Sequence, residues 1–355
     1  MNRFIRGARP YWVRIGDDVF GRVAALVGDH PTAIVTDENV APLYRDSLGL
    51  DAPTYVAPAG EGAKSLRELE ALLEFLVDSE LDRSSVLVAL GGGVVSDLAG
   101  LAASLYLRGI DVIHVPTSFL AQVDASVGGK TAVNLSHGKN LAGTFHAPNE
   151  VLIDPTTLGT LPEVEYRSGL GEVVKSALIG DGELLELLER EAARVHARDV
   201  DLLGEIIDRS IAVKATVVAN DEFETGERAV LNLGHTFAHA IEHAAGFGVV
   251  PHGIAVGVGL VLALRASERS GRLEDDSLVA RVTELLRRLK LATSLEDLAE
   301  SHSLTWSAES LAAGLRHDKK GRVGEPAFVL PRAVGNVDYG VRLPHELWHE
   351  LLTPR

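Results

Sequence analysis

The sequence contains no cysteine among its 355 residues. This absence excludes disulfide bonds and thiolate-bound zinc, so any metal must be held by His, Asp, Glu or water. Basic charge is also scarce, because 34 Lys and Arg residues stand against 50 Asp and Glu residues, a formal net charge of -16. Nucleic-acid binding needs a clustered basic surface, so no nucleic-acid partner is expected.

Long apolar runs are missing as well. The longest, Ile254 to Leu264, is too short to span a bilayer. The first residues, MNRFIRGARPYW, lack the apolar core of about 7 to 15 residues that a signal peptide needs. We therefore expect a cytoplasmic protein with no membrane partner. The 46% hydrophobic and 24% charged residues are typical of soluble globular proteins, and the length suits two domains.

The first part of the chain, from Tyr11 to Asp154, alternates short Val/Ile-rich runs with Leu/Ala-rich stretches. This order predicts successive β-α units, with strands in TAIVTD, PTYVAP, SSVLVALGG, DVIHVP and EVLIDP. The run Val86 to Leu90 is continuously apolar, which is typical of a parallel sheet covered by helices on both faces. The pattern predicts a Rossmann-like α/β domain over residues 1–161.

The second part, residues 162–355, has longer runs with helical periodicity, as from Glu183 to His196 and from Asp276 to Leu289. One exception is Pro326 to Leu343, where AFVLP and NVDYGVRL predict a short hairpin. We expect a mostly α-helical second domain.

Two glycine-rich segments are candidates for anion binding. Gly91-Gly92-Gly93 lies between an apolar strand and a helical pattern, where a backbone can approach a cofactor phosphate, although such a turn is equally common as a purely structural feature. Asp97 follows closely. The polar stretch from Pro116 to Asn140 carries Asp124, Lys130 and Lys139 and is predicted to be a loop. An anion site and a solvated connection both fit it.

Histidines provide the candidates for metal binding. His235 and His239 are four residues apart and share a helix face, but HxxxH without the Glu of HExxH is also typical of a structural pair. His243 continues the same row, and His252 precedes an apolar helix. Glu172 and Lys175, three apart, are compatible with a surface ion pair. Spacing alone leaves these alternatives open.

Several segments together, in order and spacing, resemble the 3-dehydroquinate synthase family of sugar-phosphate cyclases. They are GGGVVSDLAG, YLRG, VPTSFLAQVDASVGGKTAVN, GKN, GLGEVVK, ETGER, LNLGHTFAHAIEH, PHG and HDKK. The resemblance implies an N-terminal NAD-binding domain, a helical metal-binding domain and a homodimer. It also implies an enzyme that converts 3-deoxy-D-arabino-heptulosonate 7-phosphate to 3-dehydroquinate and phosphate, with NAD reduced and reoxidised in each turnover.

The resemblance also implies a role for individual residues. Glu172, His235 and His252 would bind zinc, with cobalt as an alternative. NAD would contact Asp37, Glu61, Lys64, Gly92, Gly93, Val94, Asp97, Thr117, Ser118, Lys130, Lys139, Thr157 and Thr160. The sugar phosphate would contact Asp124, Lys130, Asn140, Lys175, Lys214, Arg228, Asn232, His239 and one of Lys319 and Lys320, with Arg108 reaching the neighbouring subunit's substrate.

Three positions depart from the family pattern. Ser96 stands where glycine is commoner, Gly171 where alanine usually precedes the glutamate, and Ile254 where an acidic residue often follows His-Gly. The last change removes a carboxylate beside a predicted metal ligand, which can alter metal affinity. Sibling cyclases that make valiolones, deoxy-inosose or aminodehydroquinate are the nearest alternatives, and metal-dependent polyol dehydrogenases and an inactive NAD-binding protein are more remote. Lys214, Asn232 and His239 favour dehydroquinate synthase.

Overall fold

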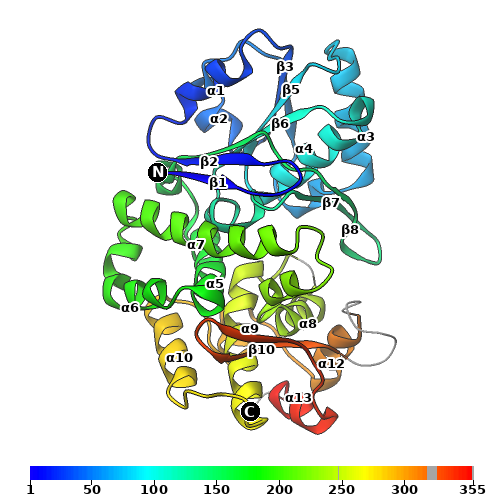
Figure 1. The fold of residues 1–355 in the computed structure, drawn as a ribbon. Coiled ribbons are helices and arrows are strands. Elements are labelled where there is room, and N and C mark those ends of the chain that lie inside the picture. Colours follow the sequence, from blue (N-terminus) through cyan, green and yellow to red (C-terminus); the bar gives the residue numbers. More distant parts are fainter. Residues whose placement is uncertain (247, 318–325, 354–355) are drawn as a thin grey trace. The chain divides into compact units, whose positions relative to one another are not determined.

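The structure, a computed structural model, describes residues 1–246, 248–317 and 326–353 (Figure 1). The predicted substrate lysines Lys319 and Lys320 lie outside these residues. The chain divides into one unit of Met1–Leu161 with Leu203–Ala219 and another of Pro162–Leu202 with Asn220–Arg355. Part of one long helix, α7 (Val200–Asn220), thus belongs to the first unit. Arg3 of the first unit holds α7 through two hydrogen bonds, of 3.0 and 2.6 Å, to the carboxylate of Asp208 in that helix.

A seven-stranded sheet forms the centre of the first unit, in the order β1-β2-β9-β6-β5-β3-β4. All neighbouring pairs are parallel except β1 with β2. The strands are β1 (Asn2–Ile5), β2 (Tyr11–Ile15), β3 (Thr32–Asp37), β4 (Thr54–Ala57), β5 (Val86–Gly91), β6 (Asp111–Pro116) and β9 (Glu150–Ile153). The predicted α/β fold and all five predicted strands are confirmed.

Both faces of the sheet are buried, which explains its continuously apolar strands. In β5, Leu87 and Ala89 pack into one core, whereas Val88 and Leu90 pack into the other. Helices cover the sheet, and short helical turns connect its elements (Figure 1). They are α1 (Phe20–Val27), α2 (Ala41–Tyr44), α3 (Leu66–Asp78), α4 (Gly93–Leu105), η1 (Asp46–Leu48), η2 (Glu61–Ala63), η3 (Tyr106–Arg108) and η5 (Pro155–Gly159).

The segment from Pro116 to Asn140 is not simply a loop, so that expectation is wrong. It contains a turn of π-helix, η4 (Ala121–Ala125), and the hairpin strand β7 (Lys130–Leu135), which pairs with β8 (Gly138–Phe145). The middle of β7 is buried and packs against α4, and this tertiary contact outweighs the polar composition of the segment.

The second unit is mostly helical, as predicted. Its elements are α5 (Glu163–Gly180), α6 (Gly182–His196), η6 (Glu227–Asn232), α8 (His235–Ala245), α9 (His252–Arg269), α10 (Leu278–Arg288), α11 (Leu295–His302), α12 (Ala308–His317), β10 (Phe328–Ala333), β11 (Asn336–Val341) and α13 (His345–Leu351). The antiparallel pair β10 and β11 confirms the predicted hairpin.

Helix α9 is the centre of this unit. Most of its residues are buried, and it packs against α5, α8, α10, α13 and β10. Its apolar sequence is therefore explained by contacts on every side. Among the described residues, no helix is long and apolar enough to cross a membrane.

Candidate functional site

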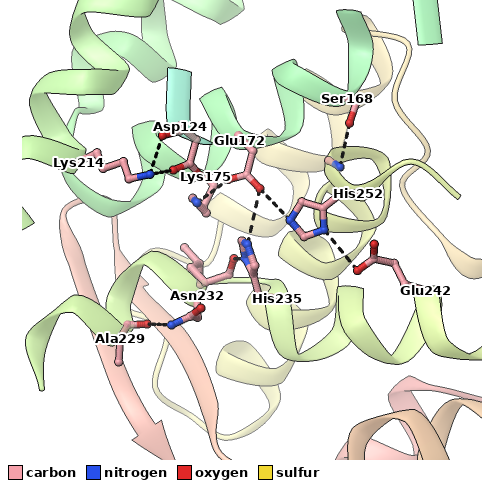
Figure 2. Close-up of polar contacts among 12 residues, drawn as sticks. Asp124, Ser168, Glu172, Lys175, Lys214, Ala229, Asn232, His235, Glu242 and His252 are labelled. Atoms are coloured by element: carbon pink, nitrogen blue, oxygen red, sulfur yellow. Dashed lines mark hydrogen bonds and ion pairs between the residues drawn. The ribbon is translucent and has the colours of Figure 1, made fainter. Parts of the chain in front are cut away.

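Three predicted metal ligands meet in the second unit (Figure 2). Glu172 lies in the middle of α5, and His235 and His252 are the first residues of α8 and α9. One donor atom from each lies within 4.8 Å of the others. The Glu172 Oε1 atom is 3.6 Å from His235 Nε2 and 3.4 Å from His252 Nε2. Elements far apart in sequence thus bring a carboxylate and two imidazoles together.

The distances suit a metal ion. Ligand atoms bound at about 2.1 Å to a tetrahedral ion lie about 3.4 Å from one another. The two separations from Glu172 are close to that value. A cysteine-free set of one carboxylate and two imidazoles is also typical of catalytic zinc, because it leaves a fourth position for a substrate oxygen. The residues present therefore fit a divalent metal.

Glycines allow the helices to approach closely enough to form this cluster. A Cβ atom on Gly171, the neighbour of Glu172, would lie 1.9 Å from the carbonyl oxygen of Gly253. Gly253 itself follows His252, and its N–H donates a 3.0 Å hydrogen bond to Ser168 Oγ of α5. The contact explains why glycine rather than alanine suits position 171 in this chain.

The crossing of α8 and α9 is equally close. Gly234, just before His235, has a φ of 78°, in the left-handed region that favours glycine. A Cβ on Gly259 of α9 would lie 2.2 Å from the Gly234 carbonyl oxygen. Each predicted ligand thus has a neighbouring glycine at a close contact between elements.

Burial and charge give the two histidines different protonation behaviour. Burial, assisted by the charge of Lys175, lowers the pKa of His235 to about 3 although Glu172 opposes it. Burial also lowers the pKa of His252, but the carboxylates of Glu242 and Glu172 outweigh it and raise that pKa to about 10. Without a metal, these shifts favour a neutral His235 and a protonated His252 near neutral pH, so metal binding at His252 would displace a proton.

Other predicted substrate residues lie in the same unit. The Lys175 ammonium pairs with Glu172 Oε2, and both side chains are buried, so the surface ion pair is excluded. The ring of His239 lies beside those of His235 and His252, at centroid distances of 5.6 and 6.1 Å. His243, by contrast, is exposed.

Arg228 and Asn232 are positioned by the segment before α8. The side chain of Arg228 is only 1% exposed, so it is not a surface residue, and its Nη1 donates to the carbonyl oxygen of Glu222. Asn232 Nδ2 donates to Glu224 Oε1 at 3.0 Å. The carboxylate of Asp221 organises this turn by accepting backbone N–H bonds from three later residues, Thr225, Gly226 and Arg228. These backbone bonds lower the pKa of Asp221 to about 2.

A second polar cluster lies in the first unit, near the amino end of α4. Lys64 Nζ is buried and donates to Asp97 Oδ2 at 2.6 Å and to Asn140 Oδ1 at 2.5 Å. Glu61 Oε1 lies 3.7 Å from the same ammonium. Burial raises the pKa of Asp97, and Lys64 opposes the shift. The structure therefore unites four predicted residues from separate segments.

The glycine turn itself lies between β5 and α4. Gly92 begins α4 as its N-cap, and Gly93 is the first helical residue. A Cβ on Gly92 would lie 3.2 Å from Ser118 Oγ, and one on Gly91 would lie 2.6 Å from Val95. Packing against Val95 therefore explains the glycine at position 91. The amino end of α4 has backbone N–H groups that can bind an anion. Thr117 is buried and its N–H bonds to the Gly91 carbonyl oxygen.

Lys214 and Asp124 form a close pair in the first unit. Lys214 Nζ bonds to the Asp124 carboxylate and, at 2.7 Å, to its carbonyl oxygen. Residues 203–219, which include Lys214, cluster with the α/β unit. Lys130 is exposed, whereas Lys139 and Val94 are half-buried.

Three of the remaining predicted residues form hydrogen bonds within the first unit. The Asp37 carboxylate accepts N–H bonds from Asn39 and Val40 after β3. Thr157 bonds to Gln122, and Thr160 Oγ1 lies 2.6 Å from the Tyr44 hydroxyl. Arg108 is exposed and has a φ of 71°.

Sequence reasoning missed Glu242, a buried carboxylate whose Oε2 lies 3.3 Å from His252 Nδ1. The helical spacing of the sequence could have indicated this residue. Glu242 follows His235 by seven residues, so both lie on one face of the predicted helix.

The fold of the α/β unit and the helical unit is similar to that of solved cyclases. One structure of similar fold, a 2-deoxy-scyllo-inosose synthase complexed with carbaglucose-6-phosphate, NAD+ and Co2+, has a TM-score of 0.87 at 27% identity, covering 99% of each chain. Another, 2-epi-5-epi-valiolone synthase from Streptomyces hygroscopicus with NAD+ and Zn2+ bound, has a TM-score of 0.84 at 28% identity, covering 96% of this chain and 95% of that one.

Sequence comparison identifies the particular family. Residues 54–168 match the 3-dehydroquinate synthase N-terminal family and residues 169–321 the 3-dehydroquinate synthase C-terminal family. The 3-dehydroquinate synthase of Rhodospirillum rubrum is 44% identical over 341 residues, covering 93% of this chain and 88% of that protein. The chain belongs to the 3-dehydroquinate synthase family, as the sequence motifs predicted.

Proposed function

We propose that the chain converts 3-deoxy-D-arabino-heptulosonate 7-phosphate to 3-dehydroquinate and phosphate, a step of aromatic amino acid biosynthesis by the shikimate pathway. The observation that carries the proposal is the cluster of Glu172, His235 and His252 in a chain of this family. When bound, NAD supplies a reversible hydride acceptor and a divalent metal supplies a Lewis acid. Phosphate leaves by β-elimination, and ring closure is an intramolecular aldol step.

Glu172, His235 and His252 are the proposed metal ligands, and zinc is the proposed metal, with cobalt as a substitute. The donor set and its spacing support this assignment. Lys175 lies against Glu172 and holds positive charge beside the ligands. That charge stabilises an oxyanion on the substrate by direct pairing.

The residues proposed to bind NAD lie in residues 1–161. The turn of Gly92, Gly93 and Val94 offers backbone N–H groups to a pyrophosphate, and Thr117 and Ser118 lie beside it. The buried set of Asp97, Lys64 and Glu61 supplies polar groups for a nucleotide. Contacts to NAD are also proposed for Asp37, Lys130, Lys139, Thr157 and Thr160.

The proposed substrate residues supply charges that match a carboxylate and a phosphate. Arg228 is the proposed partner of the carboxylate, because a guanidinium can form two parallel bonds to such a group. Asp124 and Lys214, which form an ion pair, are also proposed to contact the substrate. The other proposed contacts in the α/β domain are Lys130 and Asn140. Those in the helical domain of residues 162–355 are Lys175, Asn232, His239 and one of Lys319 and Lys320.

We further propose that the protein is a cytoplasmic homodimer. The exposed position of Arg108 supports a role for this side chain toward a neighbouring subunit. Arg108 and its neighbour Leu107 both have a left-handed backbone conformation, which is energetically costly for residues other than glycine. This backbone geometry sets the direction in which the Arg108 side chain leaves the chain.

Assay of phosphate release tests the proposed reaction. With the heptulosonate phosphate, we expect phosphate and 3-dehydroquinate in equal amounts, identified by NMR, and a need for NAD well below the substrate concentration. A sugar phosphate that lacks the carboxylate should be a poor substrate, and its preferred turnover would instead support a sibling cyclase, the second candidate that the two similar structures favour. NADH accumulating in step with product would mean a dehydrogenase.

A further inference from the structure

The ring of His252 lies between two buried carboxylates. Its Nε2 faces Glu172 Oε1 at 3.4 Å, and its Nδ1 faces Glu242 Oε2 at 3.3 Å (Figure 2). Glu172 and Glu242 are each only 1% exposed. We propose that Glu242 is a positioning residue that orients His252 for metal binding, an inference that rests on the proposed metal site.

The chemistry of histidine ligation supports this role. A neutral imidazole that binds a metal through Nε2 carries its hydrogen on Nδ1, and a carboxylate that accepts this N–H holds the ring and makes the ligand more basic. Glu242 has the matching position on the opposite side of the ring from Glu172. It does not belong to the group of donor atoms within 4.8 Å, so it supports a ligand rather than binding the ion itself.

The two histidines differ in how they are held. The Nδ1 of His235 lies 3.2 Å from the carbonyl oxygen of Leu233, so backbone holds this ring. His252 is more exposed, with 29% of its side chain accessible against 13% for His235. Among the described residues, Glu242 is the group that faces its Nδ1. His252 therefore depends on a side chain for its orientation.

The carboxylate beside His252 Nδ1 does not come from position 254. Ile254 is buried two residues after His252 and provides no carboxylate from α9. The carboxylate comes instead from α8, seven residues after His235 and on the same helix face. One helix thus supplies both a proposed metal ligand and the group that orients another.

The test measures metal affinity directly, with Zn2+ or Co2+ in competition with a coloured chelator. Glu242→Ala should raise the Kd for Zn2+ about tenfold to hundredfold, and the isosteric Glu242→Gln should raise it less, since an amide oxygen still accepts the N–H bond. The visible absorption of bound Co2+ should change in both variants because the ligand geometry loosens. Glu150→Gln is the matched control, since Glu150 is also buried, pairs with Arg14 and belongs to the other unit.

A double-mutant cycle separates positioning from general stability. If Glu242 acts through His252, then Glu242→Ala should weaken binding no further in a His252→Ala background. A zinc Kd within twofold of wild type in folded Glu242→Gln and Glu242→Ala, additive losses in the cycle, or an equal loss in Glu150→Gln would each overturn the proposal. Failure of the wild-type protein to bind metal would instead refute the proposed metal site.

Discussion

Gly171 and Gly253 bring the backbones of α5 and α9 into direct contact beside two proposed metal ligands. A Cβ on Gly171 would lie 1.9 Å from the Gly253 carbonyl oxygen, and one on Gly253 would lie 1.7 Å from the Ser168 carbonyl oxygen. Neither contact involves a flexible side chain, so a larger residue must separate the helices. The spacing between Glu172 and His252 therefore depends on this crossing.

We expect Gly171→Ala to lower the unfolding free energy by about 1 to 3 kcal/mol, the usual cost of overpacking, and to weaken zinc binding. Gly257→Ala is the control on α9, because its Cβ would meet its nearest atom at an ordinary 3.7 Å. That variant should be neutral or gain up to about 1 kcal/mol from its lower unfolded-state entropy. Thermal unfolding and metal titration measure both, and identical behaviour of the two variants would contradict the packing argument.

Removal of the metal should abolish activity, and zinc or cobalt should restore it. His235→Ala should abolish metal retention because it removes one of three proposed ligands. The exposed His243 lies on the same helix, and His243→Ala should retain the metal at the wild-type level. Metal analysis of dialysed protein is the measurement, and equal losses in the two variants would show that the ligand face is wrongly assigned.

Arg228→Ala should lower kcat/KM by roughly two to four orders of magnitude, since losing the partner of a desolvated charge costs about 3 to 5 kcal/mol. Metal content and NAD affinity should stay near wild type. Arg281→Ala removes a guanidinium of the same unit that pairs with Glu189, and should leave kcat/KM unchanged. Steady-state kinetics distinguish the two, and near-normal turnover by Arg228→Ala would remove this residue from the substrate site.

His114 should make the protein less stable in acid. Burial first, and then the charge of His146, lowers its pKa to about 4, and among the described residues its Nδ1 has no hydrogen-bond partner. Because the folded pKa is below the unfolded value of about 6.5, the stabilisation is complete above pH 6.5 and is lost as the pH falls toward 4, by roughly 3 kcal/mol.

Chemical denaturation between pH 7 and pH 4 measures this loss. His114→Leu should flatten the dependence of unfolding free energy on pH, because the buried titrating group is gone. His137→Leu replaces an exposed histidine and should leave the dependence as in wild type. A parallel pH dependence in wild type and His114→Leu would rule out His114 as its source.

Much of the fold follows from local sequence pattern. Continuously apolar strands such as Val86 to Leu90 predict a parallel sheet buried on both faces, and the later helical periodicity predicts a helical unit. The order of motifs also identified the family. Hairpin β7 and β8 was missed because the stretch around it is polar and interrupted by glycines, and packing of β7 on α4 decides its conformation.

The sequence by itself determined which residue types were available for the proposed site: without cysteine, a metal must be held by groups such as Glu172, His235 and His252. Spacing along the chain did not decide between His235, His239 and His243, which share one helix row. The tertiary structure favours His235, because the crossings of α5, α8 and α9 bring it beside Glu172 and His252 and leave His243 exposed. Glu242 likewise became a partner of His252 only through packing, since contacts between separate helices depend on their close approach and not on sequence distance.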